Sequence, residues 1–402
     1  MKVAYVTSYD SEDLHAWSGC GVHIRLALQN AGLEMETLVQ MGRNQVRLEQ
    51  PKAGMTLESS GRGLTDKRPL LYKIKKVLYK ALGKNYLRDR EPAVLRSYAA
   101  QVDDALSASD CDVVFSPGTL PIAYVQSRKP IVFWTDATFG GLVGFYPLFS
   151  KLCAETLQSG HAADRLILQK CRLAIYTSEW AARTAVDIYG ADPTKVRVVP
   201  FGANIPCDRT VEDVRLLAAR KNFDVCRLLF IGVDWLRKGG DQAVRVAEHL
   251  VKCGVPTELH IVGCDPPAGL PPFVKLHGFV SKKTEAGAQL LNRLMNESHF
   301  LIVPSLAECY GVVFAEASSF GLPSLSTNVG GISSVISNGR NGQTFPLGEE
   351  AGKYAEWIAP LMRDRAAYEK LAVTSFEEYQ ARLNWEVAGR AVRKLLEEFC
   401  AK

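Results

Sequence analysis

Two glutamates, Glu308 and Glu316, lie in the segment from Pro304 to Pro323 and are the strongest candidates for chemistry in this sequence. A glycine turn follows Glu308, and Glu316 falls inside the helix that the pattern predicts at Val312–Phe320. A loop that leads into a helix lets both carboxylates point into one cleft, where they can accept hydrogen bonds from sugar and ribose hydroxyls. Taken singly, Glu308 is also compatible with a surface loop, and Glu316 with a carboxylate favoured by the helix dipole.

A basic turn supplies a second candidate site. Arg237 and Lys238 are followed by Gly239 and Gly240, after a predicted strand and before a helix that begins at Asp241. Two cations beside two glycines can neutralise a leaving diphosphate while backbone N–H groups add hydrogen bonds. The alternative is a solvated basic turn, and the position of the motif at a strand end favours binding.

Two glycines, Gly19 and Gly21, open the helix that follows the first predicted strand. They let a ligand approach backbone N–H groups closely, and the helix start favours an anion there. The motif is not GxGxxG, and the second strand ends in Val39 without the acidic residue that binds a ribose, so a nicotinamide site is disfavoured. A plain tight turn is the other interpretation of the glycines.

These candidates depend on strands that end next to them. Short apolar runs alternate with helical patterns, and most runs are continuous in Val, Ile, Leu and Phe, as in parallel strands covered on both faces. The pattern starts afresh near residue 225, which predicts two doubly wound α/β sheets. The predicted strands are 3–7, 35–39, 112–116, 131–135, 173–177 and 196–200 in the first half, and 227–232, 258–263, 274–276, 300–304 and 323–327 in the second.

The length of 402 residues, 47% of them apolar, exceeds what one core usually serves and predicts two domains. A stretch rich in Pro, Gly and Asn at 198–210 marks the boundary. We therefore predict a first domain at 1–205, a second domain at 206–380 and a last helix, 381–402, that returns to the first domain. Ligands bind outside the carboxyl ends of strands in such sheets, so the expected active site is the central cleft that the two domains face.

The joint pattern resembles the GT-B glycosyltransferases of family 4, which are retaining enzymes with two Rossmann-like domains. Their two-glutamate signature is matched by Pro304-Ser305, Glu308, Gly311, Glu316 and Gly321-Leu322-Pro323. The resemblance extends over nearly the whole chain, through Lys238-Gly239, the hinge at 199–204 and the glycines at 330–331 and 342.

For the second domain, the resemblance implies a role for each matching residue. Glu316 would hold the nucleotide ribose. Glu308 would contact hydroxyls of the donor sugar, with the backbone of Gly311 and Val312 nearby. Lys238 would bind the diphosphate.

Elsewhere the match is partial. Gly19 and Gly21 correspond to the glycine loop near the donor phosphates and the acceptor, and Phe279 lies in the run expected beside the base. The family's Arg five or six residues before the clamp lysine is missing here, and Arg237 is the substitute. The family's His at the end of a first-domain strand is replaced by Asp136, which accepts hydrogen bonds but does not donate when ionised.

We expect transfer of a sugar from a nucleoside diphosphate sugar to a hydroxyl of a saccharide or glycolipid acceptor, with Asp136, Lys238 and Glu308 as the catalytic residues. No cluster has the spacing of metal ligands, so no metal or other cofactor is expected. A net charge of +5 does not imply nucleic acid. Two rivals remain: a nucleotide-sugar epimerase on the same fold, and an inactive sugar-nucleotide-binding subunit. The base (UDP, GDP or ADP) stays open.

A basic segment at 62–96 stands apart from these motifs. Leucine, isoleucine, valine and alanine recur at helical spacing between residues 70 and 82, among many Lys and Arg. The pattern fits three interpretations: a stripe that covers the first domain, a helix on an anionic membrane surface, or a face that grips an anionic or lipid-linked acceptor. Scattered cysteines and the lack of a signal peptide or long apolar run favour the cytoplasm, with a peripheral position on the inner face of the membrane as an extension.

Overall fold

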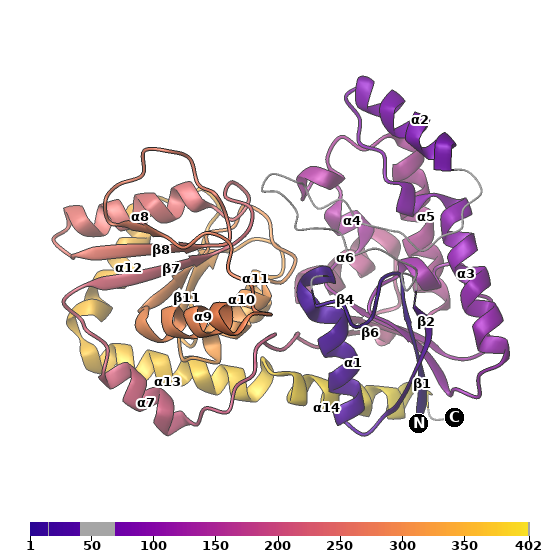
Figure 1. Ribbon diagram of the computed structural model, residues 1–402. Helices are drawn as coiled ribbons and strands as arrows, with labels where there is room; N and C mark the ends of the chain where they lie inside the picture. The colour runs from indigo at the N-terminus through magenta and orange to yellow at the C-terminus, as the bar shows by residue number, and fades with distance from the viewer. Residues whose placement is uncertain (15, 41–68, 401–402) are drawn as a thin grey trace. The chain divides into compact units, whose positions relative to one another are not determined.

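The computed structural model describes residues 1–14, 16–40 and 69–400 and divides the chain into two compact units. Unit 1 comprises Met1–Val199 and Ala388–Lys402, and unit 2 comprises Pro200–Val387. Each unit is built on a six-stranded sheet in which all strand pairs are parallel, with helices on both faces (Figure 1). The prediction of two doubly wound α/β sheets is therefore confirmed.

The sheet of unit 1 has the order β2-β1-β3-β4-β5-β6. Its strands are apolar along their length because both faces are covered: Ile131 to Thr135, for example, are all buried. The strands are β1 (Lys2–Thr7), β2 (Glu34–Gln40), β3 (Val113–Ser116), β4 (Ile131–Thr135), β5 (Leu173–Tyr176) and β6 (Val196–Val198). The helices are α1 (Cys20–Asn30), α2 (Pro69–Ala81), α3 (Pro92–Ser107), α4 (Phe139–Leu142), α5 (Ala154–Lys170), α6 (Glu179–Tyr189) and the part of α14 (Trp385–Cys400) from Ala388 onward.

The last helix packs on α1 within unit 1. A side chain on Gly389 would place its Cβ 2.4 Å from the carbonyl oxygen of Ala27, so the two helices approach closely only because this position is glycine. Arg393 extends the contact by donating to the carbonyl oxygen of Ala31 at 2.6 Å.

The sheet of unit 2 has the order β12-β11-β10-β7-β8-β9. The first strand of the unit, β7, therefore lies between β8 and β10, and the strand order reverses there. The strands are β7 (Cys226–Ile231), β8 (Thr257–Val262), β9 (Val274–Leu276), β10 (Phe300–Ile302), β11 (Ser324–Thr327) and β12 (Gly342–Phe345). Strand β12 was not predicted, because its sequence Gly-Gln-Thr-Phe lacks an apolar run; it forms the edge of the sheet by pairing with β11.

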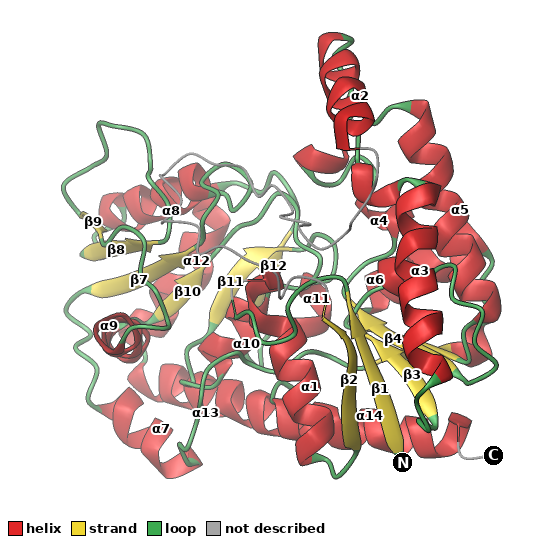
Figure 2. Ribbon diagram, turned by 45° about the vertical axis from the view of Figure 1, so that its right-hand side comes forward, coloured by secondary structure: helices red, strands yellow, loops and turns green. Residues whose placement is uncertain are grey.

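The helices of unit 2 are α7 (Val211–Ala219), α8 (Gly240–Lys252), α9 (Glu285–Glu297), α10 (Val312–Ser318), α11 (Ile332–Val335), α12 (Ala351–Arg363) and α13 (Arg365–Arg382). The predicted helix after Gly311 is confirmed as α10. Figure 2 shows helices on both sides of the strands in this unit as in the other.

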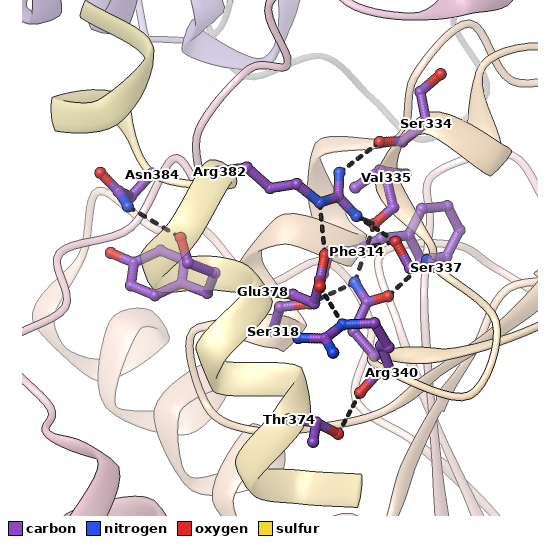
Figure 3. Close-up of polar contacts among 12 residues, drawn as sticks. Phe314, Ser318, Ser334, Val335, Ser337, Arg340, Thr374, Glu378, Arg382 and Asn384 are labelled. Carbon is purple, nitrogen blue, oxygen red and sulfur yellow. Dashed lines mark hydrogen bonds and ion pairs between the residues drawn. The ribbon is translucent and has the colours of Figure 1, made fainter. Parts of the chain in front are cut away.

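An ion cluster around the buried Glu378 ties α13 to the segment before β12 (Figure 3). The carboxylate of Glu378 binds Arg340 and Arg382, and Arg382 also donates to the carbonyl of Ser334 at 2.6 Å. Burial opposes ionisation of Glu378, but the two arginines outweigh it and hold the pKa of this carboxyl below its usual value. The cluster therefore holds the segment that leads into β12, the edge strand of the sheet.

Within the described ranges, none of the helices has the length and apolar character that spanning a bilayer requires.

Candidate functional site

The reversal of strand order in unit 2 brings two loops together. Strands β7 and β10 pair side by side, with Leu229 opposite Leu301, so the loops that follow their carboxyl ends are neighbours. The amide of Leu306, after β10, donates to the carbonyl of Arg237, after β7, at 2.7 Å. The basic turn and the loop of the first glutamate therefore form one site, although about 70 residues separate them.

Glu308 bridges the two cations of the basic turn. Its Oε2 accepts a hydrogen bond from Lys238 Nζ and lies 3.4 Å from a terminal nitrogen of Arg237. The same nitrogen donates to the carbonyl of Ala307 at 3.0 Å. The side chains of Glu308, Lys238 and Arg237 are 11%, 12% and 19% exposed. The three charges are therefore mostly buried but still accessible to solvent. An anion that reaches this site meets two fixed cations and one competing carboxylate.

Backbone geometry aims the basic turn at this site. Gly239 has φ +77°, and a Cβ there would lie 2.0 Å from the carbonyl oxygen of Pro304. Only glycine allows the turn to lie this close to the loop after β10. A Cβ on Gly240 would lie 2.3 Å from the ring of Trp235, whose Nε1 donates to Asp241 at 2.8 Å. The two glycines are therefore needed because a side chain at either position would clash, and the close packing that they allow positions the two cations.

The second glutamate lies in α10 and has a different partner. Glu316 is buried, and Lys282 Nζ donates to its Oε1. The helix begins after Gly311, which has φ +87° and turns the chain from the loop of Glu308 into α10. Val312 is half-buried at the first helical position, where backbone N–H groups have no acceptor within the helix. The two carboxylates thus engage different cations at the two ends of one short segment.

Phe279 lies in the loop after β9 and is 70% exposed. The loop is held at its start, because Gly263 donates its amide to the carbonyl of Gly278 at 2.8 Å. Next to it, the rings of His260 and His277 stack, with 3.0 Å between Nδ1 and Nε2. Phe279 is therefore an exposed apolar ring on a fixed loop at the carboxyl edge of the sheet.

In unit 1 the glycine loop has an unusual backbone. Trp17, Ser18 and Gly19 have successive φ values of +49°, +56° and +82°. Non-glycine residues rarely adopt this region, and such strain gathers at binding sites. A Cβ on Gly21 would lie 2.2 Å from the hydroxyl of Tyr9. Burial raises the pKa of Tyr9, whose hydroxyl has no hydrogen-bond partner in the described part of the chain.

Asp136 joins this loop from the end of β4. Trp17 Nε1 donates to its Oδ2 at 3.2 Å, which links Asp136 to the residues just before Gly19. The aromatic residues on either side of Asp136 belong to the core. Trp134 is buried and donates to the carbonyl of Val199 at 2.9 Å, and Phe139 is 1% exposed. Packing therefore accounts for both aromatic residues.

Several residues of these sites were not predicted: Asp234, Lys282, Tyr9 and Trp17. Asp234 accepts the amide of Arg237 at 3.1 Å and so holds the basic turn. Sequence position hints at three of them, since Asp234, Tyr9 and Lys282 follow strands closely. Their partners are tertiary contacts, which spacing along the chain does not reveal.

A cavity of about 430 Å³ lies elsewhere in unit 1, where β4 begins. It is lined by cations that include Arg128, Lys170 and Lys195, and burial lowers the pKa of Lys170 to about 8. None of the predicted site residues lines it. Among the described residues, no group of three or more His, Cys, Asp or Glu side chains has the arrangement of a metal site.

Comparison with known proteins agrees with this geometry. Residues 225–364, which contain the basic turn and both glutamates, match the family model of glycosyl transferases group 1. The D-inositol 3-phosphate glycosyltransferase of Acidothermus cellulolyticus is 29% identical over 219 residues. That match covers 50% of this chain and 46% of the relative, so the chain spans about half the length of this curated relative.

Solved structures match over the whole chain. The sucrose-phosphate synthase of Thermosynechococcus elongatus has a TM-score of 0.66 and 18% identity, and the match covers 100% of this chain and 99% of that one. HepE of Anabaena in complex with UDP-glucose has a TM-score of 0.60 and 16% identity, with 99% and 100% covered. At identities this low, the matches show only that the fold is shared. Residues 225–364 are therefore similar to the glycosyl transferases group 1, and the chain as a whole has the GT-B fold.

Proposed function

We propose that this protein is a retaining glycosyltransferase that moves a sugar from a nucleoside diphosphate sugar to an acceptor hydroxyl. One observation carries the proposal: Glu308 meets Arg237 and Lys238 at the point in unit 2 where the strand order reverses. Open α/β sheets bind nucleotides at such points. The structural neighbour HepE was solved with UDP-glucose, which supports a donor of this class.

In the proposed donor complex, Lys238 and Arg237 bind the diphosphate. Glu308 turns from these cations to the hydroxyls of the donor sugar, and Glu316 exchanges Lys282 for the ribose. Phe279 lies beside the base, and Gly311 and Val312 supply backbone close to the sugar. Each carboxylate exchanges an ion pair for hydrogen bonds from hydroxyl groups, so binding of the donor carries little net loss of contacts.

We propose that the sugar is transferred with retention of configuration. The bond from the anomeric carbon to the diphosphate oxygen breaks, and the acceptor oxygen forms its bond on the same face. The acceptor proton passes to the departing diphosphate, whose charge Lys238 and Arg237 neutralise. On this scheme no metal ion or other cofactor takes part, and the basic side chains perform the electrostatic work.

The glycine loop and Asp136 form the proposed acceptor side of the reaction. We propose that Gly19 and Gly21 let the substrate approach the backbone closely, while Asp136 accepts a hydrogen bond from a sugar hydroxyl. The hydrogen bond from Trp17 fixes the orientation of Asp136. The acceptor would be a saccharide or glycolipid.

We propose a cytoplasmic location, which is supported by ten free cysteines, several of them buried as small apolar groups. We also propose a peripheral position on the inner face of the membrane, which depends on the surface of α2.

The test begins with a thermal-shift screen of UDP, GDP, ADP and their sugars, since a bound donor raises the melting temperature. The sugar nucleotide with the largest shift is then incubated with saccharide and glycolipid acceptors. Proton NMR of the product reads the configuration of the new linkage. Retained configuration is expected, and an inverted linkage would overturn the proposed reaction course.

The variant Glu308→Ala separates this function from its two rivals. For a transferase, turnover falls by ~10²-fold or more when a contact to the transition state is lost. An epimerase converts the sugar nucleotide without any acceptor. An inactive subunit binds nucleotide but shows no turnover in either form of the protein.

A further inference from the structure

Among the described helices of unit 1, α2 has the most exposed large apolar side chains. Figures 1 and 2 both show it projecting beyond the ends of α3 and α5, away from the sheet. Its thirteen residues, Pro69–Ala81, divide into three faces around the axis at about 100° per residue.

One face anchors the helix to unit 1. Tyr72 is buried, and Tyr79 stacks on Tyr86 with 5.8 Å between ring centroids. Between them on this face, Lys75 lies 2.6 Å from Glu91 and also binds Glu155. Burial disfavours the charge on Lys75, but the two carboxylates outweigh it and raise the pKa of the ammonium group. Aromatic contacts and ion pairs therefore fix the rotation of α2 about its own axis.

With that rotation fixed, the apolar face points to solvent. Leu70, Ile74 and Val77 are 69%, 56% and 69% exposed. Leu71 and Leu78 continue the same face, and Leu82 follows directly after the helix. The five helical positions span an arc of about 120°. The interpretation that this stripe covers the first domain is wrong for the described residues, because the tyrosine face makes the contact instead.

The third face is basic. Lys73, Lys76 and Lys80 are exposed and lie along one border of the apolar face, and Lys84 follows in the turn after it. The run from 69 to 84 contains no Asp or Glu. An apolar stripe bordered by lysines matches the chemistry of an anionic lipid surface, where the stripe enters the acyl boundary and the ammonium groups meet the headgroups.

A neighbouring loop extends this surface. Asn85 donates its side-chain amide to the carbonyl of Ser150 at 2.8 Å, which holds the loop 147–151 beside the end of α2. That loop presents Leu148, 49% exposed, and the exposed Lys151. The same pairing of an apolar side chain with a lysine thus recurs next to the helix.

We infer that α2, together with the loop 147–151, docks unit 1 onto a bilayer that contains anionic lipids. The seven exposed apolar side chains of this surface enter the interface, and the bordering lysines bind the lipid phosphates. A partner protein with an apolar docking surface would fit the leucines and isoleucine of α2 but would leave its lysines without anionic partners. The inference sharpens the proposed peripheral position and does not depend on sugar transfer, so it is tested without any activity.

The experiment is co-sedimentation of the full chain with vesicles of equal parts phosphatidylglycerol and phosphatidylcholine, compared with phosphatidylcholine alone. Binding to the anionic vesicles at low salt is expected, with weaker binding at high salt and to neutral vesicles. Ile74→Ser with Val77→Ser lowers the affinity by at least about tenfold, since both side chains are exposed in the free protein and inserted when bound. Lys73→Gln with Lys80→Gln lowers it by about 25-fold, from about fivefold per lysine.

Matched controls come from exposed positions of unit 2. Leu216→Ser with Val251→Ser repeats the apolar change on other helices, and Lys252→Gln with Lys370→Gln repeats the charge change. Both controls keep wild-type vesicle binding. Unchanged melting temperatures of the α2 variants show that they fold, as expected for side chains that contact little in the free protein.

Three results overturn the inference. The wild type fails to bind anionic vesicles at low salt, or the α2 variants bind them as well as the controls do. Alternatively, the protein is a dimer without lipid, the Ile74→Ser, Val77→Ser variant is a monomer, and vesicle binding is the same for both. The last result would assign the face to a second copy of this chain.

Discussion

Replacement of Glu308 by glutamine is the most informative single change at the donor site, because it moves two measured quantities in opposite directions. In the ligand-free protein the Glu308 carboxylate binds Lys238 and lies 3.4 Å from Arg237. A diphosphate that binds these cations must share them with the carboxylate. Glutamine keeps the shape and a hydrogen-bond acceptor but removes the competing negative charge.

The magnitude follows from the geometry. Unit charges about 3.4 Å apart interact with ~5 kcal/mol at an effective dielectric constant of ~20, and the hydration of the released groups offsets most of this. A remainder of ~1.4 kcal/mol tightens the binding of a free nucleoside diphosphate about tenfold. Turnover falls by ~10²-fold, because the carboxylate no longer holds the hydroxyls of the donor sugar in the transition state.

Isothermal titration with the nucleoside diphosphate and initial rates of transfer measure the two effects on the same preparation. Glu378→Gln is the matched control, since Glu378 also bridges two cations in unit 2, Arg340 and Arg382 (Figure 3). The control lowers the free energy of unfolding but leaves nucleotide affinity unchanged. If Glu308→Gln weakens nucleotide binding, or leaves turnover within about twofold of wild type, Glu308 merely orders the cations and the proposed role is wrong.

Three further predictions concern other parts of unit 2. Glu316→Gln weakens nucleoside diphosphate binding by about tenfold or more but leaves inorganic pyrophosphate binding unchanged, because only the ribose contact is lost; equal losses for both ligands in titration calorimetry would contradict this. In urea unfolding, Gly239→Ala lowers the free energy of unfolding by ~3 kcal/mol, since its Cβ meets the carbonyl of Pro304. Gly254 has a similar φ of +75° but open space around it, so the control Gly254→Ala lowers the free energy of unfolding by only ~1 kcal/mol. Burial and neighbouring cations lower the pKa of His299 to about 3, so the unfolded chain binds more protons between about pH 3 and the usual value of 6.5, and stability falls as the pH drops through this window. His299→Gln removes up to ~1.4 kcal/mol per pH unit from that slope, and an unchanged slope in urea unfolding at several pH values would show that another group titrates.

Most of the fold was predictable because local composition carries it. Runs such as Phe300–Ile302 and Ile131–Thr135 are apolar on both faces, which only strands between two helical layers require. The turn at Gly311 and the helix α10 followed from capping signals alone. Strand β12 was missed for the same reason, since its residues carry no local signal and pairing with β11 defines it.

The residue types of the donor site were also predictable, but their partners were not. Glycines beside Lys238 and a carboxylate at Glu316 can be recognised one segment at a time. The contact of Glu308 with Lys238 joins loops about 70 residues apart, and that of Glu316 with Lys282 joins segments 34 residues apart. Such pairings depend on the order of strands in the sheet, which no single segment encodes.

The sequence by itself determined that two carboxylates, a basic turn and a glycine loop follow strands in a doubly wound chain, because each signal is local. Only the tertiary structure decided that Glu308 lies between the two cations, and that the apolar stripe of α2 faces solvent. Helical periodicity is the same whether an apolar face meets a core or a membrane. The contacts of Tyr72, Lys75 and Tyr79 set the rotation of α2, and rotation decides which face remains uncovered.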